Sequence, residues 1–504
     1  MLYCRIILVM EPIDADFTKR FLFPPALEDF VPAGHPARFI REFVDCVLAD
    51  GDVRLTWREG HGEGRPPYSV ALLLRVWLYG YLIGLTSTRK VAAACRDNVG
   101  MMWLTGLHAP DHNTLWRFWT ANRKQIRQVF RQTVKIAAEA GMVSMALHAV
   151  DGTKIQSRAS SREAWDRKNL EKLLARTDQK IDEVEAAIEA DGEPAEGFQI
   201  PAPLQEARAM KALITQKLEV LRNEDRERYN PVDPDAQFMK LAAGGTRLAY
   251  NAQVVVEDAN SIIVAEQVVT SPSDQGQLTP MLDLVEDQLG RTAEDTVADG
   301  GYNTDQALVD AHASGRAVTL AAGPSDPESN LDKPYHASRF AYDPATDSYL
   351  CPQSQTLTFD ERKYKGGGRV VAVYRSSACV SCPVLDQCTR SKKGRSIERN
   401  PNQALIDRNR ERRRSAEGRA KMKRRSAVAE RVFARIKGPA GFTRFTFHGP
   451  LSVAAQWTWI CTAQNLRILF ARWRKESVSP PGTRVANALA ALVDLLNRFK
   501  TLDL

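Results

Sequence analysis

The chain has no long hydrophobic run. No apolar stretch in its 504 residues reaches the roughly 18–20 residues that a membrane span needs. The apolar opening, residues 1–10, is too short for a signal peptide and has no small-residue cleavage site. We therefore expect a cytoplasmic protein without a membrane partner. Acidic residues follow this opening at once, which suggests Met10 as the true start.

Cysteine is sparse and unevenly placed. Four of the eight cysteines are scattered in apolar surroundings, which is typical of reduced core residues: Cys4, Cys46, Cys95 and Cys461. The other four are close in sequence, with one C-x2-C pair among them: Cys351, Cys379, Cys382 and Cys388. This spacing predicts a tetrahedral zinc site that would stabilise an irregular, loop-rich segment after Pro324. A set of reduced thiols or a redox-sensitive cluster is the alternative.

The chain also lacks an acidic excess. It has 69 Lys and Arg against 61 Asp and Glu, and a pI near 9.0. The excess is local, because residues 389–437 hold 18 basic residues against 5 acidic ones. One concentrated basic segment indicates an acidic partner, and nucleic acid is the first to consider.

Residues 10–140 carry only helical patterns, and we expect an all-α N-terminal domain over residues 1–140. Amphipathic and apolar runs predict helices from Pro36 and from Tyr68. The segment Thr86-Ser87-Thr88 offers an N-cap for a short helix that carries Arg89 and Lys90. Short helices joined by tight turns suit a helix-turn-helix-like DNA reader, although other small helical bundles share this pattern. On this hypothesis Arg89 and Lys90 contact DNA.

Apolar and alternating runs then predict five strands, at residues 143–150, 247–256, 261–270, 295–298 and 317–320. Helices are expected at 278–289 and from Thr304, which gives one mixed five-stranded sheet with helices. The first strand ends at Asp151 and the fourth at Asp299, and glycine follows each. An aspartate at the end of a buried strand suits a functional site, but it could also simply cap a turn.

Two further segments differ in composition. Leucine and isoleucine on charged backgrounds predict two antiparallel helices, broken at residues 192–203, as a helical-hairpin insertion over 158–232. Near the end, an apolar helix at 453–470 precedes a linker and a last helix at 485–499. We expect a catalytic domain over 141–475, with a Cys-containing subdomain at 340–395, and then a linker and helix over 476–504.

A basic linker leads to a helix at 423–437, which has no Gly or Pro. Its apolar stripe is Ala429, Val432, Phe433 and Ile436. Glu430 is the lone carboxylate among basic side chains that could hold phosphate: Arg424, Arg425, Arg431, Arg435 and Lys437. Taken alone, this is an ordinary helix with a solvated basic face.

Asp151 and Asp299 change that interpretation. If the first and fourth strands are neighbours, these two carboxylates lie side by side, and a helix over that edge could add Glu430. Three carboxylates together need cations, and oxygen ligands of this kind select Mg²⁺ or Mn²⁺. Two such ions can activate a water or a 3′-hydroxyl and stabilise the leaving oxygen of a phosphodiester.

The sequences around these carboxylates, Ala149–Thr153, Ala298–Tyr302 and Ala429–Lys437, resemble the DDE transposases of bacterial insertion sequences. The N-terminal helices, the hairpin and the Cys-rich segment resemble one subgroup of them. The resemblance implies an RNase H-like core and a triad that binds two Mg²⁺. That family has an Arg upstream of the glutamate and a Lys seven residues downstream, as here with Arg425 and Lys437. Met422 stands where a Tyr is usual.

The resemblance implies a transposase that cleaves DNA at element ends and joins the 3′-hydroxyl to target DNA. Its partners would be double-stranded DNA, namely terminal inverted repeats and target, and a second copy of the chain in a homodimer or higher oligomer. Two alternatives stay open: a catalytically retired, transposase-derived DNA-binding protein, and an RNase H-like nuclease without strand transfer.

Overall fold

The computed structural model describes residues 26–57, 66–190, 202–323, 333–366, 370–438 and 441–477. The proposed start at Met10 and the helix expected at 485–499 lie outside these ranges. Within them, no helix is both long and apolar enough to cross a membrane.

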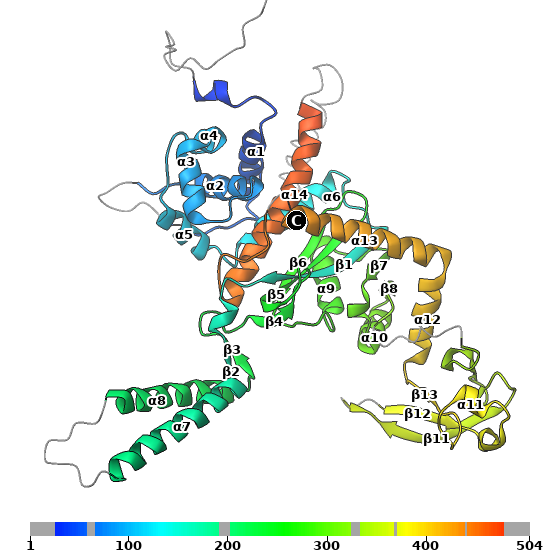
Figure 1. The fold of residues 1–504 in the computed structure, drawn as a ribbon. Coiled ribbons are helices and arrows are strands. Elements are labelled where there is room, and N and C mark those ends of the chain that lie inside the picture. Colours follow the sequence, from blue (N-terminus) through cyan, green and yellow to red (C-terminus); the bar gives the residue numbers. More distant parts are fainter. Residues whose placement is uncertain are drawn as a thin grey trace, which may run out of the picture.

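A mixed β-sheet forms the centre of the molecule (Figure 1). Its strands are β1 (Leu147–Gln156), β4 (Gln237–Lys240), β5 (Thr246–Glu257), β6 (Ile263–Val269), β7 (Asp295–Ala298) and β8 (Val318–Leu320). Their order is β4-β5-β1-β7-β8, and β6 pairs with β5. The pairs of β5 with β1, β4 and β6 are antiparallel, whereas β1–β7 and β7–β8 are parallel. All five predicted strands are present, β4 is additional, and the expectation of an RNase H-like mixed sheet is confirmed.

Helices pack against this sheet because both its faces are apolar, and the central residues of β5 are buried on each side. The helices that contact the strands are α9 (Leu278–Leu289), α12 (Gln403–Arg414), α13 (Ala416–Lys437) and α14 (Pro450–Ser477). Between β7 and β8 the chain forms α10 (Asp305–Ala313). Helix α13 lies against β1 and β7, whereas α14 contacts β6.

The N-terminal part is helical, as predicted. It consists of α1 (Pro36–Ala49), α2 (Val70–Leu82), α3 (Thr88–Asp97), α4 (Val99–Thr105), α5 (His112–Ala121) and α6 (Ile126–Glu139). Its apolar side chains share one continuous core with the sheet and α14. Trp77 of α2, for example, has its ring centroid 6.0 Å from that of Trp459 on α14. This shared core fixes the position of the N-terminal helices on the sheet.

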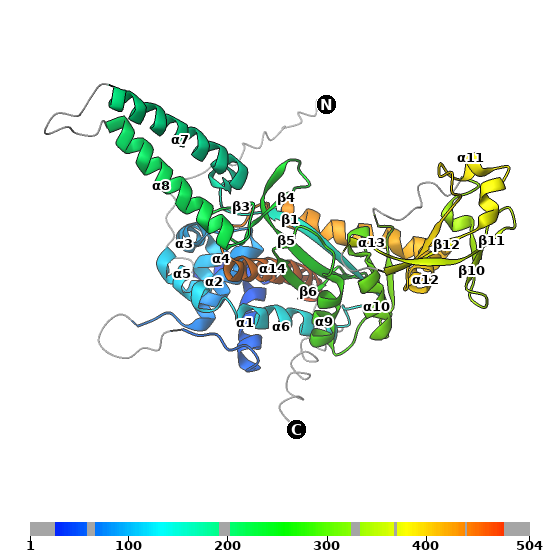
Figure 2. The same ribbon diagram turned by 90° about the horizontal axis from the view of Figure 1, so that it is seen from below.

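A helical hairpin of α7 (Arg167–Ala190) and α8 (Ala202–Asn223) projects from the body of the molecule (Figures 1 and 2). The short strands β2 (Trp165–Asp166) and β3 (Arg228–Tyr229) pair at its base. Ile214, Leu218 and Leu221 give it a small core of its own. The predicted helical-hairpin insertion is thus present.

The Cys-bearing segment is not irregular, and this expectation was wrong. It forms an antiparallel sheet in the order β13-β12-β11-β10-β9, seen at one end of the molecule in Figure 2. The strands are β9 (Ala341–Asp343), β10 (Ser348–Leu350), β11 (Thr356–Tyr364), β12 (Val370–Arg375) and β13 (Ile397–Arg399). The short helix α11 (Leu385–Cys388) lies between β12 and β13 in the chain. Its core is largely aromatic, including Phe340, Tyr349 and Tyr374. The expected basic linker instead belongs largely to α12 and the first turns of α13.

Candidate active site

The parallel pairing of β1 and β7 places Asp151 and Asp299 next to each other. Asp299 directly follows β7, but β1 continues to Gln156 because its second half pairs with β5, so the prediction that the first strand ends at Asp151 was wrong. Val150 of β1 is in register with Ala298 of β7, so Asp151 and Asp299 follow at the same level. Asp299 begins a short 3₁₀ turn and accepts a hydrogen bond from the Gly301 amide at 2.7 Å. Its charge is one of those that raise the pKa of Asp151. The sequence-based expectation that these strands are neighbours is confirmed.

Asp151 has an unusual electrostatic environment. Burial raises the pKa of its carboxyl to about 6, and Asp299 and Asp274 add to this effect, whereas Arg425 and the Gly152 amide oppose it. Arg425 Nη1 lies 3.3 Å from Asp151 Oδ2, and these side chains are only 15% and 17% exposed. A largely buried carboxylate whose charged form is disfavoured by desolvation would be stabilised by a bound cation.

Helix α13 carries the third predicted carboxylate. It packs on the sheet through Val428, Ala429, Val432 and Ile436, as the apolar stripe predicted, except that Phe433 is only partly buried and Val428 takes part. Glu430 is exposed on the flank of the helix. Lys437 lies two turns further on the same row and donates a hydrogen bond to the Thr153 hydroxyl of β1. Glu430 therefore lies on the same row of α13 as Lys437, two turns nearer the start of the helix, and its side chain is exposed.

The three carboxylates do not form a closed cluster. Among the described residues, no three His, Cys, Asp or Glu side chains are grouped so that they could hold a metal ion. The two aspartates are together and Glu430 is apart on α13. The donor set itself, carboxylate oxygens from two adjacent strands and a helix packed on them, still fits a hard cation such as Mg²⁺.

A fourth acidic residue, Asp274, lies at this site, and the sequence reasoning did not find it. Its Oδ1 accepts hydrogen bonds from Lys154 Nζ at 2.8 Å, Asn251 Nδ2 at 2.7 Å and Gln253 Nε2 at 2.8 Å. Burial raises the pKa of Asp274, but the hydrogen bonds from Lys154 and Asn251 outweigh it and hold the pKa below its usual value. Asp274 is therefore a fixed negative charge beside Asp151. No motif in its loop indicated this.

The glycines after the aspartates are required by close contacts. A Cβ at Gly300 would lie 2.1 Å from the Ala322 carbonyl oxygen, a contact that backbone atoms would have to relieve by moving. A Cβ at Gly152 would lie 2.5 Å from Gln253 Nε2. The chain therefore passes so near its neighbours at both aspartates that side chains are excluded.

The predicted DNA-contacting residues of α13 lie on two flanks. Arg425 and Lys437 are near Asp151, as described. Arg424 instead pairs with Asp258, with 2.6 Å between Nε and Oδ2. Arg431 is exposed. The structure thus brings together two of the five predicted basic residues at the aspartates.

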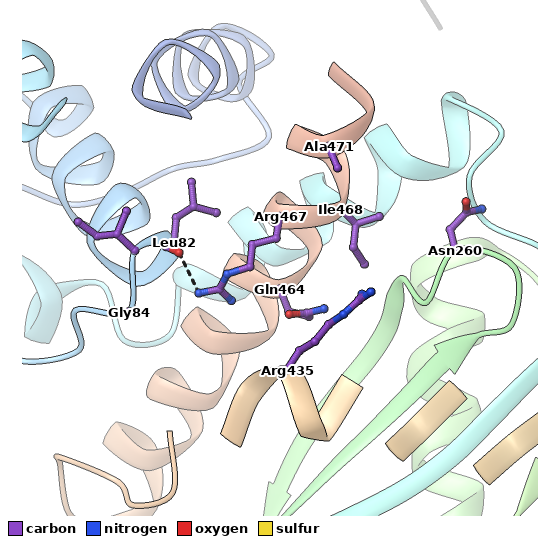
Figure 3. A pocket seen from close by; sticks show the side chains of 9 residues that line it. Leu82, Gly84, Asn260, Arg435, Gln464, Arg467, Ile468 and Ala471 are labelled. Atoms are coloured by element: carbon purple, nitrogen blue, oxygen red, sulfur yellow. Dashed lines mark hydrogen bonds between the residues drawn. The ribbon is translucent and has the colours of Figure 1, made fainter. Parts of the chain in front are cut away.

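Arg435 lines a separate cavity of about 550 Å³ between α13, α14 and the end of α2 (Figure 3). Arg467 and Gln464 of α14 line the same cavity. Arg467 donates to the Tyr81 and Leu82 carbonyls, both at 2.9 Å. Gln464 is fully buried, and its amide has no hydrogen-bond partner within the part of the chain that the structure describes.

Arg89 and Lys90 are exposed in the first turn of α3. Arg89 also lines a groove where α3 and α5 approach residues 444–452. These two residues are therefore accessible, but they belong to a different region from the aspartates.

The four clustered cysteines line one small cavity in the second sheet: Cys351, Cys379, Cys382 and Cys388. The backbone amides of Gln353 and Gln355 both donate to Cys351 Sγ at 3.3 Å. Burial and the other three thiols raise the pKa of Cys388, whereas Arg395 lowers it. The thiols thus come together, although in the described ranges no three of them are grouped closely enough for a metal ion.

Two family models match this chain. Residues 350–470 match a transposase DDE domain, a range that contains Glu430 but neither aspartate. Residues 25–121 match a transposase domain (DUF772) that covers the helices α1 to α5. No curated protein matches the chain.

Proposed function

Because two parts of the chain match transposase domains, one of them a DDE domain, we propose that the protein is a DDE transposase that catalyses metal-dependent DNA cleavage and strand transfer at the ends of an insertion sequence. The observation that supports this best is the position of Asp151 and Asp299 at adjacent parallel strands, beneath a helix that carries Glu430, Arg425 and Lys437. Double-stranded DNA is the substrate, both as terminal inverted repeats and as target.

Asp151, Asp299 and Glu430 would hold two Mg²⁺ or Mn²⁺ ions. When bound, such ions activate a water or a 3′-hydroxyl and stabilise the leaving oxygen. Asp151 is in contact with Arg425, and burial, with the charges of Asp299 and Asp274, raises the pKa of its carboxyl. Glu430 would join the aspartates from its exposed flank, because a glutamate side chain can change rotamer without moving the helix.

The basic side chains have separate tasks. Burial lowers the pKa of Lys437, which Asp151 opposes, so the ammonium is a poorly solvated charge close to the aspartates. It would contact a phosphate oxygen near the reacting bond, as would Arg425. Arg424, Arg431 and Arg435, which share the other flank of α13, would contact DNA outside the reaction centre.

The clustered cysteines would bind one structural zinc ion. This proposal is supported by the four thiols, which line one cavity, and by the two backbone amides that donate hydrogen bonds to Cys351 Sγ. Zinc analysis of the purified protein should give about one ion per chain, and Cys379→Ser should remove it, whereas Cys46→Ser, outside the cluster, should not. Purified protein without zinc, still folded, would contradict the site.

We also propose the division into a DNA-binding N-terminal domain (1–140), a catalytic domain (141–475, with insertion 158–232 and Cys-containing subdomain 340–395) and a C-terminal segment (476–504). Synapsis of two element ends requires at least a homodimer. The protein would act in the cytoplasm, where bacterial DNA is accessible.

The decisive assay uses a plasmid that carries the inverted repeats flanking this coding sequence, with Mg²⁺ and a second plasmid as target. We expect strand breaks at the repeat ends and joined products with the target. Breaks without joined products would indicate a nuclease. Binding without breaks would indicate a retired transposase.

A further inference from the structure

A basic groove lies where the N-terminal helices meet the far end of β1. It has a volume of about 960 Å³ and is lined by the start of α3, by α5 and by residues 444–452. Four arginines line it, Arg89, Arg123, Arg158 and Arg444, and no aspartate or glutamate does. The groove is therefore a positively charged surface, formed by two parts of the chain that are more than 300 residues apart in sequence.

The arginines are held in place without being neutralised. Three of them donate to uncharged oxygens: Arg444 Nε to the Ser157 carbonyl (2.9 Å), Arg158 Nη1 to the Thr446 carbonyl (3.3 Å) and Arg123 Nη1 to the Ser452 hydroxyl (3.0 Å). In the described part of the chain, no carboxylate forms an ion pair with any of the four. Fixed guanidinium groups without counter-charges provide a preorganised site for phosphates.

The candidate active site and the groove lie at successive positions along the chain of β1, since Arg158 of the groove follows this strand by two residues. Asp151 lies in the middle of this strand, Lys437 contacts Thr153, and Gln156 at the strand end pairs with Arg444. A strand rises about 3.3 Å per residue, so Asp151 and Gln156 are about 17 Å apart along it. A DNA duplex rises about 3.4 Å per base pair, so this length corresponds to about five base pairs.

We propose that this groove binds the backbone of the DNA duplex about five base pairs from the phosphodiester that reacts at Asp151 and Asp299. The inference rests on the proposed function and deepens it, because the N-terminal helices and the catalytic sheet would hold the same element end. The size and the four charges suit several phosphates rather than one small anion. Trp116, 39% exposed, provides an apolar wall on which deoxyribose can pack.

The test combines Arg89→Gln and Arg158→Gln, because both side chains are exposed and their loss should leave the core intact. The matched control is Arg222→Gln, an exposed arginine on the hairpin helix α8. Binding of a fluorescent duplex with the flanking inverted repeat is measured over a range of salt concentrations. The slope of log affinity against log salt should fall by about 1.8 in the double variant, since each lost phosphate contact removes about 0.9. The control should keep the wild-type slope.

Neutral methylphosphonate linkages then locate the contact. One placed about five base pairs from the cleaved bond should weaken binding by the wild type but not by the double variant, which has already lost the contact. An unchanged salt slope in the double variant, with normal cleavage by the wild type, would contradict DNA binding in the groove but not the proposed function. A wild type that neither binds nor cleaves the repeat would overturn both.

Discussion

Arg425 on α13 reaches Asp151 on β1, with 3.3 Å between Nη1 and Oδ2. This contact links the helix that carries Glu430 to the strand that carries the first aspartate. It joins residues 274 positions apart, and within the described ranges it is the only side-chain ion pair of Asp151.

The raised pKa of Asp151 predicts a pH-dependent stability effect in the metal-free protein. The Asp151 carboxyl has a pKa of about 6 in the folded protein, against an ordinary value of 3.8. The folded state therefore loses stability as pH rises from about 3.8 to about 6, and the loss is constant at higher pH. The cost is at most about 3 kcal/mol, at 1.36 kcal/mol per pKa unit. Asp151→Asn should therefore raise the unfolding temperature in EDTA above about pH 6, relative to the wild type, and this gain should shrink at lower pH. A gain that does not depend on pH would contradict the assignment.

Asp274 should be required for a correctly formed site. Asp274→Ala leaves the donors of Lys154, Asn251 and Gln253 without their shared acceptor, at about 1–3 kcal/mol for each buried group that water cannot reach. Asp274→Asn keeps one acceptor oxygen and should lose less stability, although it removes the charge. We expect cleavage to fall in both variants and the unfolding temperature to fall more in the alanine variant. Asp287→Asn, an exposed aspartate on α9, should change neither.

Gly300 and Gly301 provide a matched pair. A Cβ at Gly300 would meet the Ala322 carbonyl at 2.1 Å, whereas one at Gly301 would meet the Asp274 carboxylate at 3.3 Å. Gly300→Ala should thus cost about 1–3 kcal/mol or more, as overpacking does, and should displace Asp299. Gly301→Ala should cost clearly less. Equal unfolding temperatures for the two variants would show that the close contact does not exist in solution.

Lys437 and Arg435 should differ in their effect on DNA binding. Lys437→Gln should weaken binding to all sequences and lower the salt slope by about one, because the lysine lies at the aspartates. Arg435 lines a cavity on the other flank of α13, so Arg435→Gln should change the slope less. Salt titrations of both variants with the same duplex make the comparison. A larger effect at Arg435 would place the DNA on the opposite flank.

The sequence predicted the elements of the site better than their side-chain contacts. Alternating apolar runs predicted the strand that carries Asp151 and the strand that precedes Asp299, because local burial produces that pattern, but they did not predict that β1 continues beyond Asp151 to Gln156. Asp274 was missed, since its role depends on Lys154 and Asn251 from two other strands. Arg158 and Arg444 were missed for the same reason: only the folded chain brings them together.

Two other differences have physical causes. The strands β9, β10 and β13 have three residues each, and β11 is largely exposed, so their alternation is weak in the sequence. Met422 packs against the main core, so an apolar side chain is accommodated at this position.

The central claim is that Asp151, Asp299 and Glu430 share bound metal. The most direct test replaces Mg²⁺ with Fe²⁺ and adds ascorbate and peroxide, so that radicals formed at the bound metal cut the nearby backbone. The wild type, mixed with repeat DNA, should be cut near residues 151, 299 and 430, and excess Mg²⁺ should suppress all three cuts. Glu430→Gln should lose them, whereas Glu219→Gln, an exposed glutamate on α8, should keep them. Cuts near 151 and 299 but none near 430, or cuts that survive in Glu430→Gln, would contradict the account.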